Sequence, residues 1–390
     1  MKPDAARTLS AHADLFAPEH EELRAQVRSF VDKELLPHAQ EWEAAEAFPR
    51  EVFKRVGDLG FFGLKYPEDV GGSGPDYVAD AVVTEELARC GSAGVSASLG
   101  GHKDLATLYV SSFGTPEQHK RWLTPAIAGD VVGGLAVTEP DAGSDVAAIT
   151  TSARRDGDDW VINGSKMFIT NGAWADFVVV AAKTDADKGY AGITLFVVDT
   201  DAAGFTSRRM PMLGWRTGQT GELTFADVRV PDGNRLGDEG SGFYAIMQNF
   251  AWERLIMALA QVAGAQLTYE LAKAYALDRT AFKRPIGKFQ VWRHRFADMA
   301  TRIEAGRALT YSALRKYVAG ENPIKEVAMA KYYTSEVAFH VADECVQVHG
   351  GYGYMMEFPA QRAWRDARLG PIGGGTSEIM KEIIGKTLGL

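Results

Sequence analysis

The spacing of apolar residues changes twice along this chain of 390 residues. From about residue 18 to residue 128, apolar residues recur at helical spacing. From about residue 138 to residue 232 they form short runs bounded by Asp and Gly, as strands do, and from residue 242 onward helical spacing returns. Strands that follow one another without intervening helices exclude a doubly wound parallel sheet. We therefore predict an α+β protein with a helical domain over 1–134, a β domain over 135–238 and a second helical domain over 239–390.

The two helical regions differ in the length of their periodic segments. In the first region, five apolar residues share one face of a helix that Pro37 is expected to end: Leu23, Val27, Phe30, Val31 and Leu35. The second region holds four longer periodic segments, at roughly 242–277, 288–318, 322–349 and 375–388. Pro and Gly residues separate these segments, which predicts a four-helix bundle.

The middle region is predicted to form a β-barrel or β-sandwich. Residues 160–162 and 165–169 flank Asn163-Gly164, and Asn-Gly tolerates the positive φ angles of a type I′ turn, so a β-hairpin is expected there. Further apolar runs that read as strands are 177–181, 193–198 and 223–228.

Charge and composition exclude several classes of protein. The net charge of −9 argues against nucleic-acid binding, which needs a basic surface. The two cysteines, Cys90 and Cys345, are far apart and form no CxxC pair, so buried thiols in a reducing compartment are expected. The eight histidines show no HExxH or similar spacing, and no metal site is predicted.

The first residues do not resemble a targeting segment. Residues 1–7 lack an apolar stretch, and Asp4 and Asp14 are unlike the acid-poor composition of a transit peptide. No uninterrupted apolar run approaches the roughly 18 residues that a membrane span needs. A cytoplasmic protein without a membrane partner is expected.

Two Gly-containing segments have the composition of ligand-binding loops. Residues 135–145 read Leu-Ala-Val-Thr-Glu-Pro-Asp-Ala-Gly-Ser-Asp, whose backbone N–H groups and hydroxyls suit the polar atoms of a flat ligand. The alternative is a well-capped turn between domains. In Gln-Val-His-Gly-Gly-Tyr-Gly-Tyr, residues 347–354, the glycines let the backbone approach a ligand closely. No G-x-G-x-x-G follows a predicted strand, so a Rossmann mode of dinucleotide binding is not expected.

These two segments, their order and the predicted domain order resemble the acyl-CoA dehydrogenase flavoproteins. The second segment continues with Glu357, Arg362 and Asp366, which also match, and the resemblance covers residues from about 15 to 390. It implies a bound FAD, an acyl-CoA substrate, electron-transfer flavoprotein as acceptor, a homotetramer, and a reaction of the kind used in fatty acid β-oxidation.

The resemblance also implies which residues contact the FAD. Those at the isoalloxazine and the start of the substrate channel would be Leu135, Val137, Thr138 and Ser144, with Phe168 and Thr170 on the other side of the flavin. Those at the pyrophosphate and adenine would be Arg279, Phe282 and Gln290, joined from a neighbouring subunit by Gln347, Gly350 and Gly351. Thr376 and Glu378 would close the pocket. Many relatives have Trp at the place of Phe168, and Phe keeps a flat apolar face.

The resemblance implies an unusual position for the catalytic base. Most members of the family carry a Glu directly before Gly-Thr near the C-terminus, where this chain has Gly374. A subset that includes long-chain and isovaleryl-CoA dehydrogenases places it instead where this chain has Glu253. On a helix, Glu253 would have Phe250, Ile256 and Met257 as neighbours, and such desolvation raises a carboxyl pKa. The alternative is a Glu paired with Arg254 or a lysine.

The implied substrate contacts are Ser144, Arg254, Gly374 and Gly375. The backbone N–H after Gly374 and a flavin ribityl hydroxyl would bind the thioester carbonyl, and residues 373–375, all Gly, are expected to leave room for a branched or bulky acyl chain. Two other functions stay open. One is an oxidase or monooxygenase of the same fold that lets oxygen reach the flavin. The other is a non-catalytic DNA-binding relative, which would need a basic C-terminal surface that this mixed tail lacks.

Overall fold

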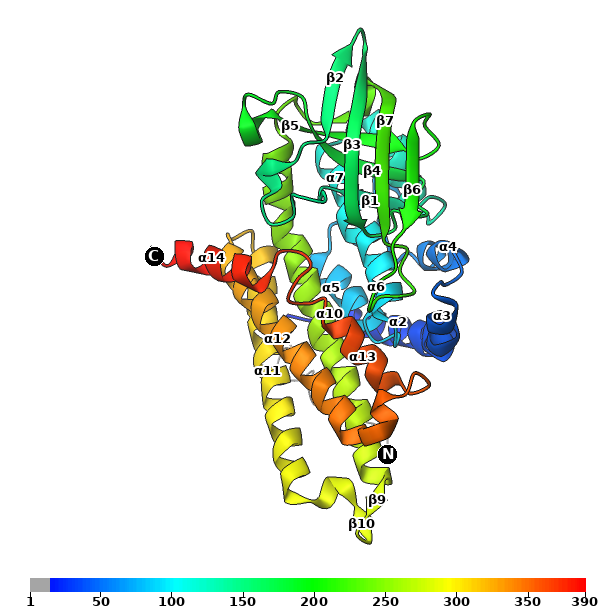
Figure 1. Cartoon of the computed structure of the whole chain (residues 1–390), viewed down its shortest axis with the longest axis vertical. Coiled ribbons are helices and arrows are strands. Elements are labelled where there is room, and N and C mark those ends of the chain that lie inside the picture. The colour runs from blue at the N-terminus through cyan, green and yellow to red at the C-terminus, as the bar shows by residue number, and fades with distance from the viewer. Residues whose placement is uncertain (1–14) are drawn as a thin grey trace.

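The computed structural model describes residues 15–390 and shows a helical N-terminal domain, a central β domain and a helical C-terminal domain (Figure 1). Asp4 and Asp14, on which the targeting argument rests, lie outside the described residues. The α-helices of the N-terminal domain are α2 (Pro18–Phe30), α3 (Ala39–Ala45), α4 (Glu51–Asp58), α5 (Tyr77–Leu87), α6 (Ala93–Gly100), α7 (Thr107–Phe113), α8 (Pro116–Gln118) and α9 (Thr124–Ile127). Wider π-helical turns join several of them: η2 (Val31–Leu35), η5 (Gly101–Ala106) and η6 (His119–Leu123).

The predicted first helix is confirmed. Val27 and Phe30 on α2 and Val31 and Leu35 on η2 are buried, as their spacing requires. Pro37 follows in a short 3₁₀ turn, Leu36–His38, before α3 begins. Proline ends the regular helix because it lacks the N–H that the next turn would use.

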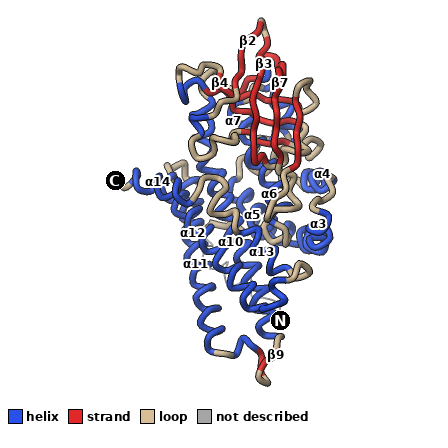
Figure 2. Tube along the Cα trace, in the orientation of Figure 1, coloured by secondary structure: helices blue, strands red, loops and turns tan. Residues whose placement is uncertain are grey.

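The strands of the β domain form one mixed sheet (Figure 2). Its strands are β1 (Gly133–Ala136), β2 (Ser152–Asp156), β3 (Asp159–Ile169), β4 (Phe177–Lys183), β5 (Ile193–Asp199), β6 (Phe205–Arg209), β7 (Gly221–Pro231) and β8 (Arg235–Leu236). The order is β6-β7-β3-β2-β4-β5-β8, and β1 pairs with β4 in parallel. Only one residue pair joins β2 to β4, so the sheet is almost divided between these two strands. Apolar side chains from the strands on both sides of this division form one cluster, in which the rings of Trp160 and Phe196 lie 5.4 Å apart. The sheet therefore folds into the two-layered arrangement that a sandwich requires.

The predicted hairpin at Asn163-Gly164 is wrong. β3 passes through this dipeptide without turning, and the tight turn lies earlier, at Gly157, between β2 and β3. At Asn163 the pairing of β3 with β7 shifts register, so the dipeptide forms a bulge. Gly164 has a φ of +149°, and a Cβ there would lie 2.5 Å from Oγ1 of Thr151. The bulge thus uses the same conformational freedom that the sequence pattern assigns to a turn.

The four long helices predicted for the C-terminal domain are confirmed to within a few residues. They are α10 (Gly242–Asp278), α11 (Gln290–Val318), α12 (Ile324–His349) and α14 (Ser377–Thr387), with a shorter α13 (Pro359–Ala367) between the last two. Helices α10, α11 and α12 run side by side, and α14 packs against α12 and points away from the bundle (Figure 1). A small hairpin, β9 (Thr280–Ala281) and β10 (Arg284–Pro285), follows α10 at the far end of the bundle.

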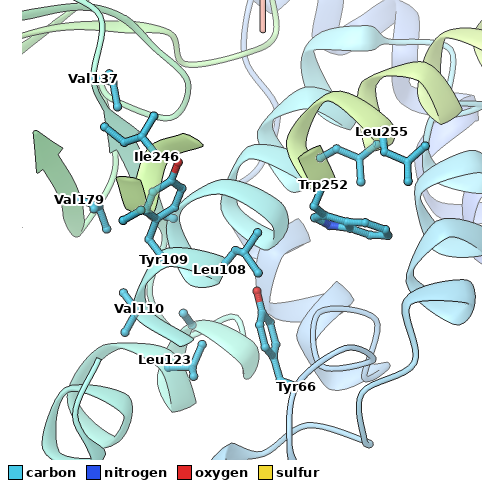
Figure 3. Close-up of a cluster of buried hydrophobic side chains, with 14 of the residues drawn as sticks. Tyr66, Leu108, Tyr109, Val110, Leu123, Val137, Val179, Ile246, Trp252 and Leu255 are labelled. Atoms are coloured by element: carbon cyan, nitrogen blue, oxygen red, sulfur yellow. The ribbon is translucent and has the colours of Figure 1, made fainter. Parts of the chain in front are cut away.

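Helix α10 joins the three domains. By length and composition it could cross a membrane, but half of its most apolar window is buried inside the protein, as in a core helix. Its residues Ile246, Trp252 and Leu255 share one apolar core with Tyr109 of α7 and Val179 of β4 (Figure 3). Because α10 is held in this shared core, the polar side chains that it carries have fixed positions relative to the N-terminal helices and the β domain.

Candidate active site

The carboxyl group of Glu253 lies inside the protein, at the start of the fourth turn of α10. The residue is 9% exposed, and Trp252 and Ile256 beside it are also buried. The hydroxyl of Tyr109 donates a hydrogen bond to Oε1 of Glu253 at 2.8 Å. Among residues 15–390, no Arg, Lys or His nitrogen lies within ion-pair distance of this carboxylate, so the alternative of a Glu paired with Arg254 or a lysine is not realised.

Burial dominates the electrostatics of Glu253. It raises the pKa of the carboxyl to about 8, against the opposing effects of the Tyr109 hydrogen bond and the positive charge of Arg254. The guanidinium of Arg254 lies 4.6 Å from the centre of the Phe250 ring, and its Nε donates to the carbonyl oxygen of Gly374 at 3.4 Å. A carboxyl with such a pKa is a stronger proton acceptor, once ionised, than a solvent-exposed Glu.

The glycines of residues 373–375 pack directly against the turn of α10 that carries Glu253. A Cβ on Gly374 would lie 2.2 Å from Sδ of Met257, and a Cβ on Gly375 would lie 3.6 Å from Nη2 of Arg254. The loop at position 374 therefore lies against the stretch of α10 that also carries Glu253. The expectation that these glycines leave open room is wrong at Gly374, because the thioether of Met257 fills that space.

Lys331 of α12 anchors the same loop from the other side. Its Nζ donates to the carbonyl oxygens of Gly370, at 2.9 Å, and Gly375. Ser335, one turn later, donates to the Gly370 oxygen at 3.1 Å. Because both ends of the loop are held by buried side chains, the backbone around Gly374 has a fixed position relative to α10.

The loop after β1 is fixed to β3 by a buried ion pair that sequence reasoning missed. Nζ of Lys166 donates to the carbonyl oxygen of Val137 at 2.9 Å and to Oε1 of Glu139 at 2.8 Å. The backbone N–H groups of Thr150 and Thr151 also donate to the Glu139 carboxylate. Glu139 belongs to residues 135–145 and Lys166 to the predicted strand 165–169. The available signal was a charged residue next to the apolar residues 167–169 of a predicted strand.

The residues predicted to flank the flavin lie together. The backbone N–H of Met167 donates to the carbonyl oxygen of Thr138 at 2.9 Å, which joins the two segments, and Thr170 reaches Gly134 of β1. Leu135 is partly buried, Val137 is 8% exposed, and Ser144 is exposed on the loop beyond them.

Phe168 has the features of an aromatic face kept free for a ligand. It is 54% exposed, and its φ of +62° is rare for a bulky side chain. Such strain persists where the surroundings impose it, and it clusters at binding sites. A flat ring such as an isoalloxazine fits this exposed face and the polar backbone of the adjoining loop.

The residues predicted for the pyrophosphate and adenine lie at the other end of the bundle. Arg279 follows the last turn of α10, about 39 Å from Glu253 at about 1.5 Å per residue. Phe282 is 89% exposed, and Gln290 begins α11. Gln347, Gly350 and Gly351 share this end, where the rings of Tyr275 and His349 stack 4.1 Å apart. Both groups of residues therefore lie at the end of the bundle that is remote from Glu253.

Thr376 and Glu378 follow the glycine loop directly. Oγ1 of Thr376 accepts a hydrogen bond from the backbone N–H of Ile379 at 3.2 Å and so caps α14. Glu378 is exposed in the first turn of that helix. Both therefore stand beside the loop that contacts α10.

Two further residues of the site were not found from the sequence. Tyr109 is distant in the chain, and no spacing connects it to Glu253. Asn249 lies one turn before Glu253 on the same face of α10, is 6% exposed, and its Nδ2 has no hydrogen-bond partner in the described part of the chain. Buried donors are nearly always paired, so this one is a candidate to meet a ligand. Helical spacing from Glu253 could have indicated it.

Three family models match nearly the whole chain. They are described as the N-terminal, middle and C-terminal domains of acyl-CoA dehydrogenase, and they match residues 17–130, 134–228 and 240–389. The long-chain specific acyl-CoA dehydrogenase of Mus musculus is 40% identical over 377 residues, which cover 96% of this chain and 87% of that protein. Isovaleryl-CoA dehydrogenase of Oryza sativa subsp. japonica is 38% identical over 382 residues, covering 97% and 93%.

A solved structure agrees with these matches. The crystal structure of an acyl-CoA dehydrogenase from Geobacillus kaustophilus superimposes with a TM-score of 0.92 at 40% identity, and the match covers 96% of this chain and 99% of that one. The chain therefore belongs to the acyl-CoA dehydrogenase family, whose members are FAD-dependent oxidoreductases.

Proposed function

We propose that this protein oxidises an acyl-CoA thioester between its α and β carbons, with Glu253 as the base. The observation that carries the proposal is a buried carboxyl group that has no cationic partner within the described part of the chain. It lies next to the loop where most relatives carry their base. Burial raises the pKa of Glu253 to about 8, so the ionised form is poised to take a proton from a weakly acidic carbon.

The proton comes from the carbon next to the thioester carbonyl. As the α C–H bond breaks, its electron pair forms the new double bond, and the β-hydrogen leaves with the electrons of its own bond. Bound FAD supplies the acceptor for that hydride. The negative charge that develops on the thioester oxygen needs hydrogen-bond donors, and the backbone N–H of Gly375 is the candidate in this chain.

Other residues of the chain bind and shield the reactants. Phe168 would hold the flavin ring on its exposed face. The ion pair of Lys166 with Glu139 keeps Val137 and Thr138 in place beside it. Arg254 would attract the negatively charged CoA while it holds the carbonyl oxygen of Gly374. Trp252 and Ile256 exclude water from the base.

The oligomeric state is part of the proposal. Arg279, Phe282 and Gln290 can serve an FAD only if a second chain brings its flavin-binding region to their end of the bundle. Gln347, Gly350 and Gly351 lie there too, and a Cβ on either glycine would meet nothing within 4 Å, so a cofactor could approach the backbone closely. We therefore propose at least a dimer, within a homotetramer, and electron-transfer flavoprotein as the acceptor.

Anaerobic titration of the FAD-loaded protein with straight, branched and aromatic acyl-CoAs tests the activity. We expect at least one of them to bleach the flavin absorbance. Glu253→Gln should bind the same thioester, seen as a shift of the flavin spectrum, without bleaching. No bleaching by any thioester would contradict the reaction class, and bleaching of the variant at the wild-type rate would contradict the base.

A further inference from the structure

Tyr109 makes the single hydrogen bond that the described structure gives to the Glu253 carboxyl. Its side chain comes from α7 of the N-terminal domain and is completely buried. The hydroxyl donates to Oε1 at 2.8 Å, while Oε2 has no hydrogen-bond partner among residues 15–390. Figure 3 shows the Tyr109 hydroxyl turned toward α10, beside Ile246. The two oxygens of the carboxyl group are therefore not equivalent.

The hydrogen bond from Tyr109 restricts the rotation of the Glu253 side chain. A Glu side chain turns about three bonds, and a base that turns freely presents its lone pairs in the productive direction only part of the time. The helix beneath it is already fixed, because Nε1 of Trp252 donates to Oδ1 of Asp104 at 3.0 Å. Asp104 and Tyr109 belong to the consecutive elements η5 and α7, so one segment holds both the backbone and the carboxyl group.

Tyr109 is suited to donate and not to accept. Burial, together with the nearby negative charge of Glu253, raises the pKa of its hydroxyl well above the usual range, so the O–H keeps its proton throughout the working pH range. The other charged groups that act on Glu253 are Arg254 on α10 and Asp104 on η5, and neither forms a hydrogen bond to its carboxyl.

We propose that Tyr109 is a positioning residue that holds Oε1 of Glu253 and leaves Oε2 as the oxygen that receives the substrate proton. The proposal rests on the function proposed above, in which Glu253 is the base. It assigns to the N-terminal domain a direct part in setting the geometry of a base carried by the C-terminal domain.

The test variant is Tyr109→Phe, which keeps the ring and its packing against Phe113 and removes only the hydroxyl. The matched control is Tyr311→Phe, because Tyr311 is also buried and donates to a buried carboxylate, that of Glu85, at 2.7 Å. Both variants are compared with wild type as FAD-loaded proteins.

The first readout needs no substrate. The infrared band of the protonated Glu253 carboxyl, identified as the band missing from Glu253→Gln, is titrated with pH. Loss of a hydrogen bond that favours the ionised form should move the midpoint upward by about one to two pH units in Tyr109→Phe. Tyr311→Phe should leave it unchanged.

The second readout is the anaerobic rate of flavin reduction. In Tyr109→Phe we expect kcat to fall about tenfold even on the plateau above the midpoint, with KM within about twofold, because the base is misdirected and not merely protonated. FAD content and thermal midpoint should match those of Tyr311→Phe. An unchanged infrared midpoint and an unchanged plateau rate would overturn the proposal.

A second substitution keeps the test decisive if Tyr109→Phe does not fold. Replacement of Tyr109 by 3-fluorotyrosine retains the hydroxyl and strengthens it as a donor, so the infrared midpoint should fall. A midpoint that does not move would count against the contact. If instead Glu253→Gln still reduces its flavin, the proposed base is wrong, while the infrared titration still reports whether Tyr109 binds Glu253.

Discussion

Two buried carboxyl groups lie close together in this protein and have opposite surroundings. Asp104 belongs to a fully buried cluster with Asp80, Lys65 and Lys103, in which each carboxylate meets both ammonium groups. Among residues 15–390, the one hydrogen-bond partner of the Glu253 carboxyl is the neutral hydroxyl of Tyr109. The two sites are neighbours, because Trp252 beside Glu253 donates its indole N–H to Asp104.

The comparison separates burial from charge pairing. Burial acts to raise the pKa of both carboxyl groups. Lys103 and Lys65 override it at Asp104, whose pKa is held below its usual range, while at Glu253 burial prevails and the pKa rises to about 8. Removing one partner from a buried ion pair is strongly destabilising, whereas a buried acid without a cation can exchange its proton.

The largest effect should come from breaking the paired site. Asp104→Asn leaves two buried ammonium groups facing one carboxylate and one amide, and we expect unfolding to become easier by about 3–5 kcal/mol. Chemical denaturation followed by circular dichroism measures this. An equal loss of stability in Glu253→Gln would remove the distinction between the two carboxyl groups.

Shortening Glu253 to Asp should leave the free energy of unfolding nearly unchanged and slow flavin reduction. In Glu253→Asp the carboxylate recedes by one methylene and loses the Tyr109 hydroxyl, so we expect flavin reduction about 100-fold slower. Stopped-flow absorbance gives the rate, and the thermal midpoint of the same sample is the control. A rate near that of wild type would mean that the proton leaves by another route.

The pH dependence of the two sites should also differ. Flavin reduction should rise with pH to a plateau with a midpoint near 8 in the enzyme, since only the ionised Glu253 accepts a proton. The contribution of Glu253 to the free energy of unfolding should instead fall as pH rises. The pKa of Glu253 is higher in the folded than in the unfolded state, so its contribution to stability is complete below about pH 4 and is lost as pH rises to about 8.

The side chain in Glu253→Gln cannot ionise. As pH rises to about 8, the free energy of unfolding of this variant should therefore increase relative to that of wild type, and chemical denaturation at several pH values measures the difference. Parallel curves would contradict the raised pKa.

A smaller effect is expected where the glycine loop meets α10. Gly374→Ala adds a Cβ at a φ of +64° and against Met257, so we expect a loss of about 1–2 kcal/mol and a raised KM. Gly320→Ala is the control, because Gly320 has a φ of +72° and open space around it. If both variants lose the same stability and keep the same KM, the contact with Met257 has no functional weight.

The smallest effect should come from Asn249. Asn249→Leu removes an unpaired buried donor, so stability should stay the same or rise slightly. If that donor meets the substrate, KM should rise by about five- to tenfold while the plateau rate changes little. Steady-state kinetics distinguishes the two parameters, and an unchanged KM would assign Asn249 to packing alone.

Much of this architecture can be predicted from local patterns. Helical periodicity locates α2, α10, α11 and α12, and the apolar runs locate β4 and β5. The Asn163-Gly164 hairpin fails because a bulge uses the same backbone freedom as a turn, and only the pairing of β3 with β7 decides between them. The conformational preferences of Asn and Gly do not predict which strands pair.

The site is predictable only where its residues stand in one segment. Glu253 can be identified from its motif and its apolar helix face. Tyr109 cannot, since its contact depends on how α7 packs against α10, and neither can Met257 filling the space beside Gly374. Arg279 and Gln347 lie at the same end of the bundle because of the directions in which α10 and α12 run, and no residue pattern gives those directions.

Single-turnover flavin reduction in Glu253→Gln, with a thioester shown to bind, tests the central claim most directly. Glutamine keeps the shape of the side chain and can still accept a hydrogen bond from Tyr109, but it cannot serve as a base. We expect the rate to fall at least about 10³-fold on the plateau above pH 8 and to lose its dependence on pH. A pH-dependent rate within about tenfold of wild type would show that another group takes the proton.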